Sequence, residues 1–288
     1  ESTDIRMLIL FIVAFIGIDI DIDDIISWMF ISKLLAVVVV AALRLYTGNS
    51  FSLHAGMLIL LYLCDNRKRL RLRHILIAFC SGVLLYLYTD TGALIVAIFI
   101  AVSLLFYNNV LKGEKIFSWK VIEYVFPIAL IANVICVLTF VEKKIPYIGD
   151  WLPESVNELF YKMVELVDIV TSSRITLAAA SWPVFGVSMW GGNIDYSLLN
   201  IGEGVYYYLD SGMMWLLQGW GIIITIIFMC LCVRMMNYFL KNKEYVLLTM
   251  GVVLAFWGIN EDMLIGIDTN FLIVFFGKAL AMKMENKG

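Results

Sequence analysis

The chain has 288 residues, of which 62% are apolar and 16% charged, with a formal net charge of −3. Its mean hydropathy of +0.90 lies far outside the usual range of soluble domains, which argues against a soluble protein. The near-neutral charge gives no sign of a nucleic-acid partner, and we predict none.

The chain consists largely of apolar runs separated by polar connectors. A transmembrane helix needs about 17–25 residues, so a chain of this length accommodates about eight or nine of them. The sequence therefore predicts an all-α, polytopic integral membrane bundle of about nine transmembrane helices, forming one domain over residues 1–288. The runs are residues 7–18, 25–43, 49–64, 75–88, 92–107, 121–141, 211–233, 245–259 and 270–282.

Two details of the runs carry further expectations. The chain begins at Glu1 without a signal-peptide pattern, so we expect further N-terminal helices in a full-length protein. The turn at residues 88–92 separates two arms of 14–16 residues, each about 21–24 Å long. Its tip should stop short of the outer surface, where Asp90 needs a partner, water or a proton.

The distribution of charge predicts the orientation. Connectors 65–74, 108–120 and 234–244 and the C-terminal tail are rich in Lys and Arg, which places them in the cytoplasm. The one long polar segment, residues 142–210 between the sixth and seventh helices, then lies outside. Nine acidic residues outnumber four basic ones there, in agreement with that orientation.

The external segment shows its own helical patterns. Pro153 and Glu154 indicate a helix start, and the apolar stripe that follows fits either an interfacial helix on the outer leaflet or a packed lid helix. Residues 171–173 should end this helix and cap a second one over residues 174–182, which Pro183 ends. The stripe consists of Val156, Leu159, Phe160, Met163, Leu166, Val167 and Val170.

Arg174 is the sharpest candidate for chemistry. It follows Ser173 at a predicted helix start, where a guanidinium beside free backbone N–H groups suits a phosphate or diphosphate. An ordinary surface salt bridge is the alternative. Arg44 and His54, near the outer ends of their runs, indicate a hydrated or paired site, with an interfacial arginine and a hydrogen-bonded histidine as the alternative.

Other polar residues have plainer interpretations. Glu261 and Asp262, in the external turn before the last run, could supply a general base toward a sugar hydroxyl. Asp210 is predicted to cap the seventh helix. His74 should be solvated, and Lys33 should snorkel or pair with one of four nearby aspartates, Asp19, Asp21, Asp23 and Asp24.

Several functional classes lack their sequence signatures. The five cysteines show no metal-ligand spacing and are predicted to be small buried hydrophobes, so neither a metal site nor a disulfide framework is indicated. P-loop, HExxH and GxSxG motifs do not occur, which disfavours an ATP-driven pump or a metalloprotease. We predict no cofactor.

Four stretches together resemble the Wzy-type polysaccharide polymerases of capsule, exopolysaccharide and O-antigen assembly. Residues 17–24 (GIDIDIDD) resemble the cytoplasmic KDIDF-like turn of that family, and residues 44–56 (RLYTGNSFSLHAG) resemble its R-x-S-x-G-F-x-H-P-N segment. The other two stretches are Ser173-Arg174 followed by Phe185-Gly186, similar to S-x-R…F-G, and Tyr208-Leu209-Asp210 followed by Glu261 and Asn270-Phe271-Leu272, similar to D-N-x-Y…E…N-x-F-L.

The resemblance implies transfer of a growing glycan from undecaprenyl diphosphate onto the next lipid-linked repeat unit. It implies a multi-pass protein of the bacterial cytoplasmic membrane, working at the outer face, with a flippase and a chain-length regulator as possible pathway partners. The implied bases are His54, Asp210 and Glu261, the diphosphate ligands Arg44, Arg174 and Ser173, and the sugar-stacking residues Trp190, Tyr206 and Tyr207. An aromatic belt explains the last three equally well.

Three alternatives remain open at this point. A lipid-linked glycan ligase of the same superfamily would move a finished chain to a different acceptor. A transporter or flippase for lipid-linked sugars is disfavoured because the sequence shows no inverted repeat. An inactive, truncated relative is the third.

Overall fold

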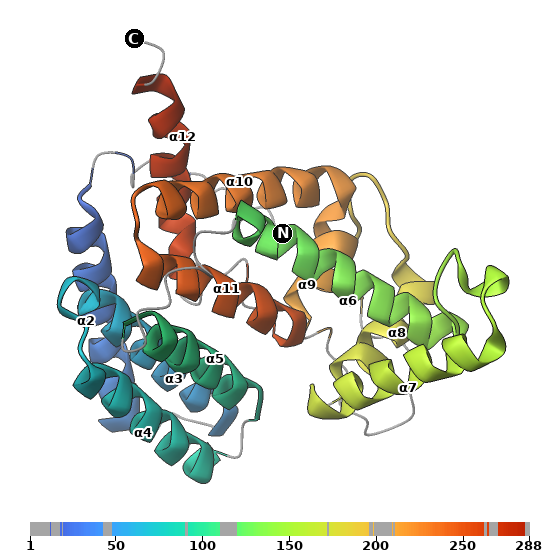
Figure 1. Cartoon of the computed structure of the whole chain (residues 1–288), viewed down its shortest axis with the longest axis horizontal. Helices are drawn as coiled ribbons and strands as arrows, with labels where there is room; N and C mark the ends of the chain where they lie inside the picture. The colour runs from blue at the N-terminus through green and yellow to red at the C-terminus, as the bar shows by residue number, and fades with distance from the viewer. Residues whose placement is uncertain are drawn as a thin grey trace. The chain divides into compact units, whose positions relative to one another are not determined.

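The computed structural model describes residues 12, 18, 20–42, 48–89, 92–109, 120–171, 173–195, 198, 209, 211–261, 264 and 270–285. Within these residues all regular structure is helical and no strand occurs (Figure 1). The all-α prediction is therefore confirmed for this part of the chain.

The helices follow the apolar runs closely. Apart from residues 12 and 18, the first run, residues 7–18, lies outside the described residues, as does the turn residue Asp90. Helix α4 ends at Thr89 and α5 begins at Gly92, so the runs on either side of that turn form two helices as predicted. The α-helices are α2 (Ile22–Ala42), α3 (Gly48–Asp65), α4 (Leu72–Thr89), α5 (Gly92–Asn109), α6 (Val125–Glu142), α7 (Glu154–Val170), α8 (Arg174–Phe185), α9 (Gly212–Trp215), α10 (Gly221–Lys241), α11 (Tyr245–Asn260) and α12 (Phe275–Glu285). Single turns of 3₁₀-helix occur at η1 (Arg67–Arg69), η3 (Lys120–Tyr124), η4 (Gly149–Trp151) and η7 (Phe271–Val274), and η6 (Leu216–Trp220) is a π-helix.

The chain divides into two compact units. Unit 1 comprises residues 1–125, 231–254 and 265–288, and unit 2 comprises residues 126–230 and 255–264. Helices α10 and α11 each contribute residues to both units. One domain over the whole chain therefore stays a prediction.

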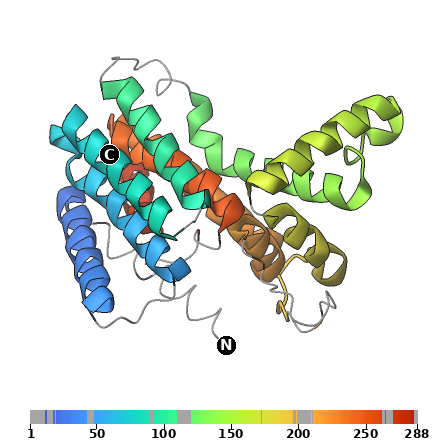
Figure 2. The ribbon, with the colours of Figure 1, turned by 90° about the horizontal axis from the view of Figure 1, so that it is seen from below.

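In unit 1, α2, α3, α4 and α5 lie side by side (Figures 1 and 2). Helix α3 contacts each of the other three, and its residues Met57, Leu60, Leu63 and Cys64 are buried. By contrast, many apolar residues of α2 and α4 point outward, among them Trp28. The helix that touches the most neighbours therefore supplies this part of the core.

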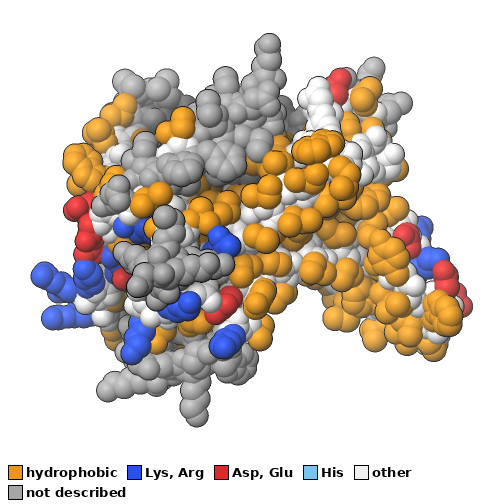
Figure 3. Space-filling view, turned by 90° about the horizontal axis from the view of Figure 1, so that it is seen from above, with side chains coloured by type: hydrophobic (Ala, Val, Ile, Leu, Met, Phe, Trp, Pro, Cys, Tyr) orange, Lys and Arg blue, Asp and Glu red, His pale blue; other side chains and the backbone are white. Residues whose placement is uncertain are grey.

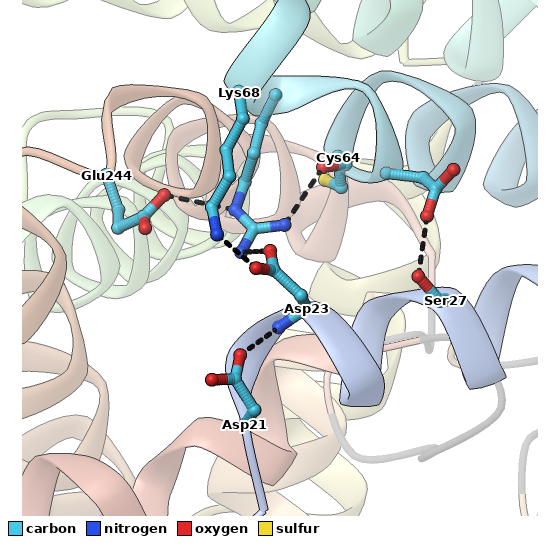
Figure 4. Close-up of polar contacts among 8 residues, drawn as sticks. Asp21, Asp23, Ser27, Cys64, Lys68 and Glu244 are labelled. Carbon is cyan, nitrogen blue, oxygen red and sulfur yellow. Dashed lines mark hydrogen bonds and ion pairs between the residues drawn. The ribbon is translucent and has the colours of Figure 1, made fainter.

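A buried arginine, Arg67, joins three segments of unit 1. Figure 4 shows Asp23, Lys68 and Glu244, one residue from each segment, close together. The Arg67 side chain is only 4% exposed and donates to Asp23 at the start of α2 and, over 3.1 Å, to Glu244 just before α11. Lys68 donates to the same Asp23 carboxylate. The charge pattern assigns the segments of Arg67 and Glu244 to the cytoplasmic side, and the predicted helix order puts Asp23 on the same side; the contacts bring all three together.

His74 differs from its sequence interpretation. The side chain was expected in solvent, but it is buried, and its Nδ1 accepts a hydrogen bond from the backbone N–H of Arg71 over 2.9 Å. Its ring also lies edge-on to Tyr62. The third residue of α4 thus caps the start of its own helix, as Glu does in a capping box, and this local role explains the burial.

Unit 2 has a core built from α6, α7, α8 and the start of α9. The side chains in it come from distant parts of the sequence and exclude solvent almost completely. They are Val137, Val164, Ile175, Ala178, Ala179, Leu209 and Met214. The two helices of the segment 142–210 are therefore packed onto α6 and do not project as a free loop.

Two helical stretches are long and apolar enough to cross a membrane. They span Lys120–Glu142 (23 residues) and Gly212–Lys241 (30 residues). The apolar windows of these stretches are only 33% and 44% buried inside the protein, unlike those of a core helix. Other apolar helices in the described part of the chain are shorter, so the count of nine transmembrane helices stays a prediction.

Hydrophobic side chains cover much of the described part of the face seen in Figure 3. Exposed Leu, Ile and Val residues occur along α2, α4, α6 and α10. The cysteines follow the same division: Cys64 and Cys232 are buried as predicted, whereas Cys80 and Cys230 are exposed and the prediction is wrong for them. An apolar residue on a helix is buried only if it faces a neighbouring helix, and within the described residues no helix covers these outward faces.

Candidate functional site

Two candidate residues from distant parts of the sequence meet in unit 2. Arg174, the first residue of α8, lies with its Nη2 3.5 Å from Oε1 of Glu261, which directly follows α11. Both side chains remain partly exposed. The backbone carbonyl of Glu261 accepts a hydrogen bond from the first residue of α9, Gly212, over 3.2 Å. A cation, a carboxylate and a helix start therefore converge at this point.

The start of α8 is capped differently from the prediction. Ser173 occupies the cap position in a left-handed conformation (φ 63°), and its side chain makes no capping hydrogen bond. The acceptor is instead Asp168 in the last turn of α7, whose Oδ1 accepts from the backbone N–H of Thr176 over 2.9 Å. A cap residue that bonds the helix start normally has an extended backbone, which Ser173 lacks, and a carboxylate from the previous helix takes its place.

This cap changes how an anion could bind. The backbone N–H of Thr176 is already paired with a carboxylate, so the start of α8 offers fewer free donors than the sequence suggested. Arg174 itself remains the residue at this helix start able to contact a diphosphate. The helix also continues to Phe185, beyond the predicted end at Pro183, and stops at Gly186 with φ 58°.

The start of α9 is also capped by a different residue. Ser211, not Asp210, holds the cap position, and its hydroxyl oxygen accepts from the backbone N–H of Met214 over 3.4 Å. The same oxygen accepts a 2.7 Å hydrogen bond from Asn133 in α6, and both residues are buried. Asp210 lies outside the described residues, as do Arg44, Tyr206 and Tyr207.

His54 belongs to unit 1 and has a cationic neighbour. Its Nδ1 lies 2.7 Å from Nζ of Lys33, a buried side chain of α2. Of the four aspartates predicted as alternatives to snorkelling for Lys33, Asp23 binds Arg67 and Lys68 instead, and ten residues of helix separate it from Lys33 by about 15 Å.

Trp190 is highly exposed, at 77%, on a loop that is held firmly. Backbone carbonyls of Ser188 and Met189 accept from the first N–H groups of α10, over 3.0 and 3.2 Å. Gly191 packs directly against Gly221, because a Cβ atom on Gly221 would lie 2.1 Å from the Gly191 nitrogen. The indole is therefore presented to solvent from a fixed backbone, which suits stacking on a sugar ring.

Sequence reasoning missed several buried polar residues of unit 2. The hydroxyl of Ser181 in α8 donates over 2.9 Å to the side-chain oxygen of Gln218, which lies in the π-helix η6. The Gln218 side-chain nitrogen is buried and has no hydrogen-bond partner. Asn133 and Gln218 interrupt apolar runs, and that interruption is the signal that could have marked them.

Within the residues that the structure describes, no three His, Cys, Asp or Glu side chains come together as metal ligands. Comparison of the chain with protein-family models, curated proteins and solved structures finds no match.

Proposed function

We propose that the protein polymerises lipid-linked oligosaccharide repeat units at the outer face of the bacterial cytoplasmic membrane, with a lipid diphosphate as the leaving group. The contact between Arg174 and Glu261 carries the proposal. The sequence predicts Arg174 as a diphosphate ligand and Glu261 as a base, on separate grounds. They lie close enough for one bound substrate to contact both.

The proposed reaction needs these two roles and no cofactor. The bond between the anomeric carbon and the diphosphate oxygen breaks, and the diphosphate leaves with the electron pair. The hydroxyl oxygen of the next repeat unit forms the new bond to that carbon, and its proton passes to the Glu261 carboxylate. Arg174 stabilises the charge that develops on the diphosphate.

The Arg174–Glu261 contact leaves room for substrate. A partly exposed ion pair contributes only about 0–1 kcal/mol, so a diphosphate with several oxygen acceptors can compete for the guanidinium. Once Arg174 turns to the diphosphate, the Glu261 carboxylate is released beside it. Trp190 then stacks on a sugar, in the role that its exposure supports.

The proposed orientation places residues 142–210 outside and the C-terminus in the cytoplasm, with about nine transmembrane helices. The Arg67 cluster supports it, because Arg67 and Glu244 come from two connectors that the charge rule assigns to the cytoplasmic side and Asp23 lies at the end of α2 that the predicted helix order puts there. The two long apolar helical stretches also support it.

A transporter of lipid-linked sugars is the second candidate function. The observation that favours it is the part-buried contact between Lys33 and His54 on two apolar helices, because ionisable pairs inside a membrane commonly mark transport paths. This site involves residues of unit 1 only, so variants can separate the two functions.

The test is complementation of a strain that lacks its polymerase and makes the matching repeat unit. Full-length protein should restore long polymer, and Arg174→Ala and Glu261→Gln should each lower polymer about 100-fold at equal membrane abundance, leaving single lipid-linked repeats. Glu158→Gln, which alters an exposed carboxylate paired with Lys162, is the matched control and should retain full activity. Unchanged polymer in Arg174→Ala would remove this site from the mechanism. If wild type makes no polymer, the polymerase proposal fails, and loss of lipid-linked sugar transport in Lys33→Ala would then support the transporter.

A further inference from the structure

Helix α7 carries three distinct faces. One packs on the protein and includes Val164 and Asp168, both buried. A second is mostly charged and solvent-exposed, with Glu154, Glu158, Lys162 and Glu165 around one exposed apolar residue, Ile169. The third is apolar and exposed, formed by Val156, Leu159, Met163, Leu166 and Val167.

The apolar face is not the face that packs. At 100° per residue, the apolar face is centred roughly 130° away from the line of Val164 and Asp168. Leu159 and Leu166 are each 63% exposed. Five large apolar side chains on one face of a helix are costly in water, since each fully buried Leu or Met gains about 1.5–3 kcal/mol. This face therefore needs a cover that unit 2 does not supply.

The neighbouring helix indicates what that cover is. Tyr161 of α7 lies 5.8 Å, ring to ring, from Phe140 in the last turn of α6, and Val137 and Val164 share one core. The stretch that contains α6 is 23 residues long and apolar, enough for the hydrocarbon core of about 30 Å. If it crosses the bilayer, its C-terminal end emerges at a membrane surface, and α7 lies at that level.

The loop before α7 carries interfacial aromatic residues. Tyr147 and Trp151 are 89% and 88% exposed. Asn157 of α7 fixes this loop: its side chain accepts from the Ile145 backbone over 3.1 Å and donates to the Gly149 carbonyl over 2.8 Å. Tyr and Trp favour the headgroup level of a bilayer, so the loop and the apolar face would meet the same surface.

We propose that α7 lies in the membrane interface, with its apolar face in the lipid, its charged face in water, and Tyr147 and Trp151 at the headgroups. Its occupant is phospholipid and not a second copy of the chain. The exposed charges of α7 are three Glu and one Lys, so apolar burial, not attraction to anionic lipid, holds the helix there. This inference does not depend on the catalytic proposal.

The test uses the whole chain reconstituted in phosphatidylcholine vesicles that contain an alkyne-tagged phospholipid. The photoreactive residue p-benzoylphenylalanine is placed at Leu159 or Met163, on the apolar face, and in matched controls at Glu158 or Glu165. All four side chains are exposed, so each replacement leaves the core intact. We expect lipid adducts at Leu159 and Met163 about fivefold or more above those at the two glutamate positions.

Three results would overturn the proposal. Equal lipid labelling at all four positions would show that α7 does not present a defined face to the bilayer. Absence of lipid adducts from the probes at Leu159 and Met163 would place the apolar face in water. Crosslinking of Leu159 to a second copy of the chain would assign the apolar face to a protein interface. The readout is lipid adduct and not polymer, so its failure is distinguishable from failure of the proposed activity.

Discussion

Asp168 of α7 accepts hydrogen bonds from both the backbone nitrogen and the hydroxyl of Thr176, two residues into α8 from Arg174. Asp168 is buried, and its backbone carbonyl accepts a hydrogen bond from the Ser173 backbone N–H over 2.8 Å. Asp168 thus joins the end of α7 to the start of α8 and holds in place the first turn of α8, which carries Arg174.

Asp168→Ala should therefore destabilise unit 2 by about 1–2 kcal/mol, because the cap of α8 is lost and the Thr176 N–H is left unpaired. Asp168→Asn keeps one oxygen acceptor and should cost less. Ser173→Ala should be close to neutral, since the serine side chain makes no capping bond. Thermal unfolding in detergent measures all three. Equal losses in Ser173→Ala and Asp168→Ala would contradict this assignment of the cap.

Removing the buried Arg67 of unit 1 should lower the free energy of unfolding by more than Asp168→Ala does. Arg67→Ala removes the shared partner of the Asp23 and Glu244 carboxylates, and we expect a loss of about 1.5–3 kcal/mol, the range for hydrogen bonds to charged groups. Lys68→Ala removes an exposed partner of the same aspartate and should cost less than about 1 kcal/mol. The two variants are compared by their unfolding temperatures at pH 7. Similar losses in both would mean that burial of Arg67 does not decide the energy.

The same cluster predicts a dependence of stability on pH. The hydrogen bond from Lys68 and the charge of Arg67 hold the pKa of Asp23 below its ordinary value of 3.8, against the opposing effect of burial. A lowered folded-state pKa means that the stabilisation is complete above the unfolded value and is lost as pH falls through the folded value. The loss should therefore occur below about pH 4.

Unfolding temperatures measured between pH 7 and pH 2.5 test this dependence. Asp23→Asn cannot titrate and should remove part of the acid-dependent loss. Lys68→Ala should move that loss to higher pH, because the hydrogen bond that lowers the pKa most is gone. An identical acid profile in wild type and Asp23→Asn would show that other carboxylates control the transition.

Local patterns in the sequence were enough to predict most helices. The start of α7 at Glu154 was predicted correctly, because Pro153 has a fixed φ and no backbone N–H and is therefore favoured where a helix begins. The division of α4 from α5 followed from the polar turn between them. Both predictions depend on neighbouring residues only, which is why a single sequence contains them.

Contacts between distant residues were beyond those patterns. Arg67 and Glu244 were each assigned to the cytoplasmic side, but their pairing depends on how α11 packs. Arg174 and Glu261 were both candidates in one compartment, and only the fold brings them to 3.5 Å. The capping role of Asp168 was not predicted, because Ser173 directly precedes α8 and serine is a favoured cap residue. Only the structure shows that the backbone of Ser173 is left-handed and that its side chain makes no capping bond.

The close approach of Gly191 and Gly221 gives the last prediction. Both have φ near 80°, and a Cβ on either would overlap the backbone of the other loop, at 2.2 Å from the Gly219 oxygen or 2.1 Å from the Gly191 nitrogen. Neither clash can be relieved by a side-chain rotation. Gly191→Ala and Gly221→Ala should each cost at least about 3 kcal/mol, from backbone strain together with overlap.

Gly192→Ala is the matched control, because nothing lies within 4 Å of its added Cβ, and it should change the unfolding temperature little. Near-ultraviolet circular dichroism and thermal unfolding separate the outcomes, since displacement of this loop also moves the exposed Trp190. If Gly191→Ala and Gly192→Ala unfold at the same temperature, the loop does not pack on the start of α10. Trp190 would then lack the fixed backbone that its proposed role in sugar stacking requires.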